Sequence, residues 1–404
     1  MAELDIRPSK AQRPNPERFQ NWEDGQWIGQ TLEVENGVCA LPTRVGSELE
    51  APLAYTDEVK AATDPLYPLV SDFIPEFEWP AYAPLVFHIN RLKAEKNAVI
   101  LAHNYMTPDI FNLIGDFKGD SLGLAIEATK VEATLIVQGG VHFMAETSKI
   151  LCPDKRVIIP SMRAGCSLAS SITGKDVRLI KERYPGIPVV TYVNTSADVK
   201  AESDICCTSS NAVAIVEHIA AERGVDKVIM IPDEFLAKNV AKQTEVEVIA
   251  WHGRCEVHAR FSAEDVREMR AANPGVVVLA HPECPPDVVA ESDFTGSTKA
   301  MSDYVSDRQP KNVILLTECS MSDNVASQNP EVDFVRPCNL CPHMKRITLD
   351  GIYRALRDEV HEVFVPEDIR ARAYQAVQRM IEVRFDPAKG YFDPSLPEEE
   401  VRVI

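Results

Sequence analysis

The feature that most constrains this fold is a pattern that recurs three times along the chain. The apolar runs VILAH, VVTYV and VVVLAH place His103, Tyr192 and His281 at equivalent positions, each 89 residues from the next. The tetrapeptide AESD occurs at 201–204 and again at 290–293, with the same separation. Several coincidences in one register predict three copies of one structural unit.

The apolar runs also indicate the fold class. From about residue 97 onward, short β-branched segments alternate with amphipathic helical stretches. Continuous apolar strands between helices are typical of parallel sheets that are covered on both faces, so the sequence predicts an α/β protein. The expected strands are AVILAH, LIVQGG, RVIIP, PVVTYV, KVIMIP, VEVIAW, VVVLAH and NVILLT.

The repeats divide the chain into five predicted segments. An N-terminal extension at 1–84 is rich in Pro, Asp and Glu with weak periodicity, and we expect it to be extended or loosely packed. The α/β repeats are predicted at 85–175, 176–264 and 265–360, and the first is free to receive contributions from the chain termini. A helical extension with a polar end is expected at 361–404.

Composition limits the partners and the location. The 404 residues carry a net charge of −19, which argues against nucleic acid and anionic membranes, since both require a basic face. No apolar stretch approaches the roughly 18 residues of a membrane span, and residues 1–10 have no apolar core typical of a targeting peptide. We therefore predict a soluble cytoplasmic protein with no nucleic-acid or membrane partner.

Three of the ten cysteines fall into the repeat register. RVIIPSMRAGC, VEVIAWHGRC and VDFVRPCNLC end in Cys166, Cys255 and Cys341, each nine residues after a valine that opens a strand. A disulfide framework is not expected, because the cytosol keeps thiols reduced. Each repeat is instead predicted to deliver one thiolate to a common axis.

Three thiolates leave more than one chemistry open. They suit an iron–sulfur cluster whose fourth corner is left to solvent or substrate, and an open three-cysteine zinc site or chance spacing are the alternatives. Read locally, the CNLC motif could be half of a zinc site or a reversible Cys338–Cys341 disulfide. Cys284 has no counterpart in the other repeats. The remaining cysteines are interpreted as small buried residues: Cys39, Cys152, Cys206, Cys207 and Cys319.

Polar side chains follow the apolar runs at three strand ends: His103 and Tyr105, Tyr192 and Asn194, His281 and Glu283. Because α/β sheets bind ligands at the carboxyl ends of their strands, we expect these side chains to share one site. Three serines, spaced 88 residues apart, each precede a helix: Ser121, Ser209 and Ser297. They are first of all candidate N-caps, and such helix ends can also bind carboxylate or phosphate.

Taken together, these residues resemble the quinolinate synthase family, the NadA-type enzymes of NAD biosynthesis. The matching stretches run in family order from about residue 86 to 360: LAHNY, GDSL, GGVHFMAETSKIL, AGCSLA, TYVNTSADVKAESDICCTSSNA, WHGRCEVH, LAHPEC, DFTGSTKAM and CPHMK. The resemblance implies three α/β/α domains around a pseudo-threefold axis. It also implies one [4Fe-4S] cluster per chain, held by Cys166, Cys255 and Cys341.

The same resemblance implies a reaction and the residues that perform it. The family condenses iminosuccinate (iminoaspartate) with dihydroxyacetone phosphate to quinolinate, phosphate and water, with the open iron as a Lewis acid. L-aspartate oxidase is the implied candidate for supplying the imine. The implied catalytic residues are Tyr105, His281 and Glu283. The implied substrate-binding residues are His103, Ser121, Tyr192, Val193, Asn194, Ser209, His281, Pro282, Glu283, Ser297 and Thr298. His142 and Glu146 match the family and have either a direct or a supporting role.

Two other functions remain open from the residues themselves. An aconitase-type hydro-lyase would share the open iron but would not need a phosphate-binding site. A non-catalytic iron–sulfur or zinc redox sensor would normally carry a module for nucleic acid or a partner, and this acidic chain has no basic motif for one.

Overall fold

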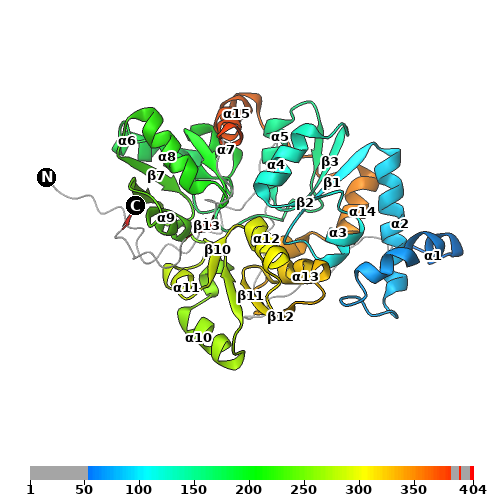
Figure 1. Ribbon diagram of the computed structural model, residues 1–404. Coiled ribbons are helices and arrows are strands. Elements are labelled where there is room, and N and C mark those ends of the chain that lie inside the picture. The colour runs from blue at the N-terminus through cyan, green and yellow to red at the C-terminus, as the bar shows by residue number, and fades with distance from the viewer. Residues whose placement is uncertain (1–52, 384–390, 393–400) are drawn as a thin grey trace, which may run out of the picture.

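The computed structural model describes residues 53–383, 391–392 and 401–404, and the interpretation of Cys39 lies outside them. The described chain forms three parallel sheets, each in its own lobe, and the lobes pack around a common centre (Figure 1). The predicted α/β class is confirmed. The domain boundaries given above remain a prediction.

The first sheet has the strand order β2-β1-β3-β4. Its strands are β1 (Ala98–His103), β2 (Phe117–Gly119), β3 (Leu135–Gly139) and β4 (Arg156–Ile158). The helices between them are α3 (Pro108–Leu113), α4 (Ser121–Lys130) and α5 (His142–Leu151).

The second sheet repeats this order as β6-β5-β7-β8, with β14 added beyond β8. Its strands are β5 (Val189–Tyr192), β6 (Ile205–Cys207), β7 (Lys227–Ile231), β8 (Glu247–Ala250) and β14 (Arg402–Val403). The helices are α6 (Gly174–Arg183), α7 (Ala197–Glu202), α8 (Ala212–Arg223) and α9 (Glu234–Ala241).

The third sheet has the order β10-β9-β11-β12, with β13 pairing antiparallel to β10. Its strands are β9 (Val277–Ala280), β10 (Phe294–Gly296), β11 (Asn312–Leu316), β12 (Asp333–Val335) and β13 (Tyr391–Phe392). The helices are α10 (Ala263–Ala272), α11 (Pro286–Ala290), α12 (Thr298–Arg308) and α13 (Cys319–Gln328), and the 3-10 turns η3 (His258–Arg260) and η4 (Met344–Arg346) follow β8 and β12.

Local signals repeat along with the topology. Thr173 and Ser262 form capping boxes with Asp176 and Asp265 at the starts of α6 and α10, and the two boxes are 89 residues apart. Each box satisfies backbone N–H groups that a helix end otherwise leaves unpaired, which fixes where the helix begins. The strands β2, β6 and β10 are missing from the predicted set because each has three residues and, unlike the equally short β4, is not part of a longer apolar run.

The described part of the chain before the first sheet differs from the expectation of a loosely packed extension, whose residues 1–52 lie outside the described residues. Residues 57–95 form α1 (Asp57–Thr63), η2 (Asp64–Leu69) and α2 (Trp79–Glu95). Val70 and Trp79 are buried there, and the Trp79 indole donates to Asp64 at 3.1 Å. Prolines interrupt the segment, so its apolar residues show no regular spacing even though they pack.

The chain after the third sheet returns to the other two. α14 (Leu349–Asp358) packs against α2 and β3 of the first sheet, and α15 (Glu367–Glu382) packs against α7, β6 and α5. Arg379 of α15 donates to the Asp204 carbonyl at 2.7 Å. α15 therefore joins the first and second lobes, as its position between them in Figure 1 shows.

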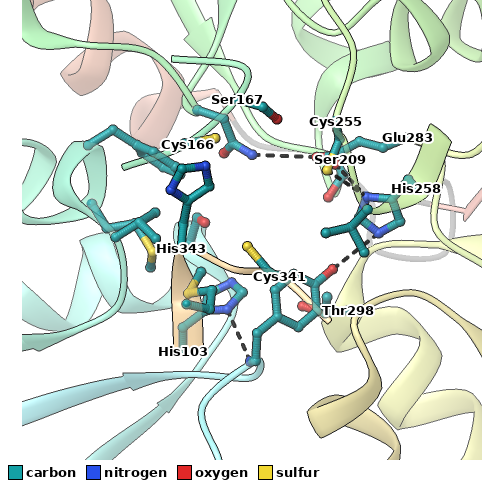
Figure 2. Close-up of a pocket in the computed structure, with 18 of the residues that line it drawn as sticks. His103, Cys166, Ser167, Ser209, Cys255, His258, Glu283, Thr298, Cys341 and His343 are labelled. Carbon is teal, nitrogen blue, oxygen red and sulfur yellow. Dashed lines mark hydrogen bonds and ion pairs between the residues drawn. The ribbon is translucent and has the colours of Figure 1, made fainter. Parts of the chain in front are cut away.

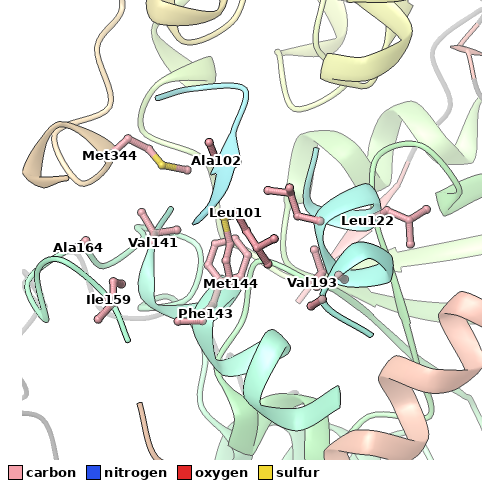
Figure 3. Packing of buried hydrophobic residues seen from close by; sticks show 14 of the residues in the cluster. Leu101, Ala102, Leu122, Val141, Phe143, Met144, Ile159, Ala164, Val193 and Met344 are labelled. Carbon is pink, nitrogen blue, oxygen red and sulfur yellow. The ribbon is translucent and has the colours of Figure 1, made fainter. Parts of the chain in front are cut away.

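An apolar core continues across the lobes and forms part of the wall of the central pocket. Figure 3 shows Val193 from the second lobe and Met344 from the third beside Val141, Phe143 and Met144 of the first. All five are buried. Burial of apolar surface holds the lobes together where the polar strand ends meet. Among the described residues, no helix combines the length and the apolar character needed to cross a bilayer.

Candidate active site

The three repeat cysteines occupy equivalent loops. The helices that carry this contact are α5, α9 and α13, which follow β3, β7 and β11. In each lobe, the backbone N–H of the helix's first residue donates to the backbone carbonyl of the residue two positions before the cysteine. These bonds run from His142 to Ala164 at 2.7 Å, from Glu234 to Gly253 at 2.7 Å and from Cys319 to Asn339 at 3.3 Å. The equivalent residues are thus Cys166, Cys255 and Cys341, and Cys338 lies outside the repeated position.

The three cysteines line one pocket (Figure 2). Burial raises the pKa of Cys166 to about 12, and the neighbouring Cys341 adds to the rise. Burial, the Glu283 carboxylate and Cys166 raise the pKa of Cys255 well above its ordinary value, and burial also raises the pKa of Cys341. Thiols in this position lose their protons together only when a shared cation compensates their charge. The donor set therefore fits a thiolate-bound metal centre.

The other cysteines of the described chain lie elsewhere. Cys338 is exposed, and its sulfur lies 3.5 Å from the sulfur of Cys319, which is itself partly accessible. Cys319 is the first residue of α13, and the prediction that it is buried is wrong, because its side chain is only partly covered. The remaining free thiols are buried: Cys152, Cys206, Cys207 and Cys284.

Two of the strand-end loops have the same conformation. The Tyr105 N–H donates to His103 Nδ1 at 3.2 Å, and the Glu283 N–H donates to His281 Nδ1 at 3.3 Å. Because Nδ1 accepts in both, Nε2 carries the proton in each neutral ring. Burial lowers the pKa of His103 to about 4 and that of His281 to about 3, so both imidazoles are neutral donors at pH 7.

Glu283 is the centre of a buried hydrogen-bond network. His258 Nδ1 lies 2.8 Å from its Oε2, and the Tyr192 hydroxyl donates to its Oε1 at 2.5 Å. Burial alone would raise the pKa of Glu283, but the imidazoles of His258 and His281 and the Tyr192 hydroxyl outweigh it and lower the pKa to about 2. The carboxylate is ionised and reaches Asn194 Nδ2 at 3.5 Å.

His258 links this carboxylate to Tyr105. The His258 Nε2 lies 3.0 Å from the Thr317 hydroxyl and 3.5 Å from the Tyr105 hydroxyl, which are themselves 2.6 Å apart. Its Nδ1 is also 3.2 Å from the sulfur of Cys255. Burial and the Glu283 carboxylate raise the pKa of Tyr105, so its phenol is protonated at neutral pH. A hydroxyl, an imidazole and a carboxylate are thus connected in series.

Three helix N-termini border the same pocket. Ser121 and Thr298 are the first residues of α4 and α12, Ser209 precedes α8, and all three line the pocket. Asn104 Nδ2 donates to the Thr298 hydroxyl at 2.9 Å. Ser297 lies one position earlier and caps α12 by accepting from the Ala300 N–H at 3.2 Å. The N-cap prediction is wrong for Ser121 and Ser209, because Asp120 and Asn211 occupy the N-cap positions of α4 and α8.

Some of the other predicted site residues line the pocket, and others lie outside it. His103, Tyr105, Tyr192, Asn194, His281 and Glu283 line the pocket. Val193 borders a small neighbouring cavity, and the Pro282 carbonyl accepts from Asn239 at 2.8 Å. Glu146 accepts from the Ala197 N–H at 3.2 Å, and its carboxylate lies 3.8 Å from His142. Glu146 therefore contacts the start of α7, and His142 lies beside Glu146, with both residues outside the pocket lining.

Several lining residues were not predicted from the sequence, namely Asp120, Phe143, Met144, Ser167, Thr208, His258 and His343. His258 is the most connected of them and follows Cys255 by three residues in WHGRCEVH. Its counterparts after the other two cysteines are Ala169 and Met344, so the repeat carried no signal for it. None of the described residues that line the pocket is Lys or Arg.

A pocket shared by three parallel-sheet lobes, and lined by three thiols, neutral imidazoles and helix N-termini, is typical of an α/β enzyme, and its thiols form a candidate metal-binding centre. A family model described as quinolinate synthetase A protein (NadA) matches residues 87–382. The quinolinate synthase of Caulobacter vibrioides is 62% identical over 329 residues, which cover 81% of this chain and 90% of that protein.

Two further relatives agree. Quinolinate synthase 2 of Mesorhizobium japonicum is 63% identical over 318 residues, covering 79% of this chain and 97% of the relative. The quinolinate synthase of Sinorhizobium medicae is 59% identical over 360 residues, covering 88% and 99%. The chain belongs to the quinolinate synthase family of NAD biosynthesis. The resemblance inferred from the motifs is confirmed, and the hydro-lyase and sensor alternatives receive no support.

Proposed function

We propose that this chain condenses iminosuccinate with dihydroxyacetone phosphate to quinolinate, phosphate and water, with a [4Fe-4S] cluster held by Cys166, Cys255 and Cys341. The observation that carries the proposal is the convergence of three equivalent cysteine loops on one pocket. When bound, the cluster supplies an open iron that acts as a Lewis acid toward a substrate oxygen or nitrogen.

The donor set favours this cluster over a single zinc ion. The ligand atoms of Cys255, His258 and Glu283 lie within 4.8 Å of one another and could hold one metal ion. In that arrangement, however, Cys166 and Cys341 would have no role, although they occupy the same repeated position as Cys255. Three soft thiolates, one from each lobe, suit an iron–sulfur centre with one site left open.

The pocket can hold anionic substrates without a fixed cation. The N-termini of α4 and α12 present free N–H groups and the positive ends of their helix dipoles beside Ser121 and Thr298. The neutral His103 and His281 add Nε2–H donors to the pocket wall. We assign the phosphate and the carboxylates of the substrates to these donors, together with Ser209, Tyr192 and Asn194.

Proton transfer is assigned to the series of Tyr105, Thr317, His258 and Glu283. The protonated phenol of Tyr105 donates a proton, and the ionised Glu283 stabilises the imidazole of His258 as that ring accepts one. Enolisation, imine formation and loss of water each require such an acid and base. His281 stacks on His258 with ring centroids 4.7 Å apart, which orients the ring in the middle of the series.

The proposal extends to the source of the substrate. Iminosuccinate is a hydrolysable imine, so an enzyme that oxidises L-aspartate must supply it close to its point of use. We propose L-aspartate oxidase as this donor and the cytoplasm as the location, since free thiols at the site require a reducing compartment.

An anaerobic preparation tests the proposed function. The reconstituted chain should contain four irons and four sulfides, as the proposed cluster requires, and should form quinolinate from iminosuccinate and dihydroxyacetone phosphate. Cys166→Ala, Cys255→Ala and Cys341→Ala should each lose the cluster and the activity. Cys338→Ala and Cys284→Ala are the matched controls and should retain both.

Two results would contradict the assignment. A brown protein with full iron content that forms no quinolinate would refute the reaction. Loss of the cluster in Cys338→Ala together with its retention in Cys341→Ala would refute the register of the third ligand.

A further inference from the structure

Two buried asparagines hold the catalytic loops from the neighbouring lobe. Asn324 of α13, in the third lobe, donates its Nδ2 to the Asn104 carbonyl at 3.0 Å and to the Met106 carbonyl at 2.7 Å. These two carbonyls belong to the residues on either side of Tyr105. One amide group therefore fixes the peptide units before and after the tyrosine.

The same contact recurs at Glu283. Asn239 of α9, in the second lobe, donates its Nδ2 to the Pro282 carbonyl at 2.8 Å and to the Cys284 carbonyl at 3.0 Å. Both asparagines follow the N-cap of their helix by six residues, and both are almost completely buried. Their Oδ1 atoms have no hydrogen-bond partner in the structure, so each amide is held through the two donated bonds alone.

The same helices also hold the cysteine loops at their other end. The N-cap carboxylate of α9, Asp233, accepts from the Cys255 N–H at 2.8 Å, and that of α13, Glu318, accepts from the Cys341 N–H at 3.3 Å. Each helix thus connects a cysteine of its own lobe to a catalytic loop of the next lobe. A short rigid helix keeps both ends at a fixed separation.

Among its described residues, the first lobe has no equivalent asparagine contact. The equivalent position of α5 is Thr147, whose hydroxyl donates to Phe143 of its own helix at 2.8 Å. The facing loop after β5 is held differently: Glu146 of α5 accepts from the Ala197 N–H at 3.2 Å, and the Thr195 carbonyl accepts from Lys200 within the second lobe. The asparagine contact is therefore present at Tyr105 and Glu283, the two residues assigned to proton transfer, and absent from the third loop.

We infer that Asn239 and Asn324 are positioning residues for catalysis, which set the placement of Glu283 and Tyr105 by binding both flanking carbonyls across a lobe boundary. The inference rests on the proposed roles of those two residues. An amide with two donors suits this task because each bond restrains one peptide unit, and two together restrain the rotation of the residue between them.

The test compares Asn324→Ala and Asn239→Ala with Thr147→Ala, which removes a polar side chain at the equivalent position of α5. Each asparagine variant should keep the iron and sulfide content and visible spectrum of the unaltered protein. Its kcat should fall on the order of tenfold to a hundredfold, with KM changed much less, because displacement of a catalytic group by about 1 Å costs about a hundredfold. Thr147→Ala should keep its kcat within about twofold.

Asparagine variants with full kcat would overturn the inference. So would a loss of activity that simply parallels the loss of cluster in all three variants, since that indicates a packing role. If an alanine variant does not fold, Asn324→Ser and Asn239→Ser, which retain one hydroxyl donor, decide by the same criteria. If the unaltered protein carries its full cluster yet forms no quinolinate, the proposed function fails instead.

Discussion

Lys345 of the CPHMK motif pairs with a completely buried carboxylate, and its removal should destabilise the fold measurably. Its Nζ lies 2.8 Å from Oε1 of Glu318, whose side chain is 0% exposed. Glu318 also accepts from the N–H groups of Ser320 at 2.9 Å and Cys341 at 3.3 Å. Lys345→Met keeps the length of the side chain but leaves this carboxylate without its cation.

The expected loss follows from the burial. Removing one partner of a buried ion pair costs about 3 to 5 kcal/mol, because the remaining charge is uncompensated. Burial already raises the pKa of Glu318 despite the neighbouring Lys345, so the carboxyl will take up a proton and the cost should lie near the lower limit. About 3 kcal/mol corresponds to a fall in Tm of roughly 6 to 12 °C for a unit of 150–250 residues.

Thermal unfolding of the cluster-free protein, followed by circular dichroism, measures this loss. The double variant Lys345→Met Glu318→Gln removes the unpaired charge and keeps an oxygen acceptor, so it should recover a large part of the Tm. Lys130→Met is the matched control, because its partner Glu127 lies at 2.8 Å on an exposed helix face, and such pairs contribute about 0 to 1 kcal/mol. A double variant as unstable as the single variant would refute the argument from an unpaired charge.

Three further outcomes are expected. Thr317→Val removes the hydroxyl that lies 2.6 Å from the Tyr105 hydroxyl and 3.0 Å from His258 Nε2. It should lower kcat at least about tenfold with the cluster retained. A variant with full kcat would exclude Thr317 from the proton-transfer series. Oxidation of the anaerobic protein by a small disulfide should link Cys338 to Cys319, 3.5 Å away, and peptide mapping that found Cys338 bonded to Cys341 would contradict this. Removal of residues 401–404 deletes β14 from the edge of the second sheet. The Tm should fall while the cluster content stays unchanged. Loss of the cluster would show that β14 also determines the conformation of the Cys255 loop.

The repeat made much of this architecture predictable. Eight apolar runs correspond to strands, and the spacing of Cys166, Cys255 and Cys341 alone predicts that they share a repeated position. The residues that escaped prediction lack repeat counterparts or periodicity. His258 contacts Glu283 and Thr317, which are separated from it by 25 and 59 residues, so only the folded chain brings them together. The same holds for Asn239 and Asn324, which read in sequence as ordinary polar residues of helices.

No Lys or Arg stands among the described residues of the pocket wall, and this affects how anionic substrates would reach the pocket. Dipoles at helix ends act only over short distances, whereas the chain as a whole carries a net charge of −19 and repels a phosphate or dicarboxylate at long range. Dissolved salt weakens long-range repulsion but hardly affects contacts inside the pocket. Moderate ionic strength should therefore accelerate substrate capture, opposite to the behaviour of enzymes that attract anions with surface lysines and arginines.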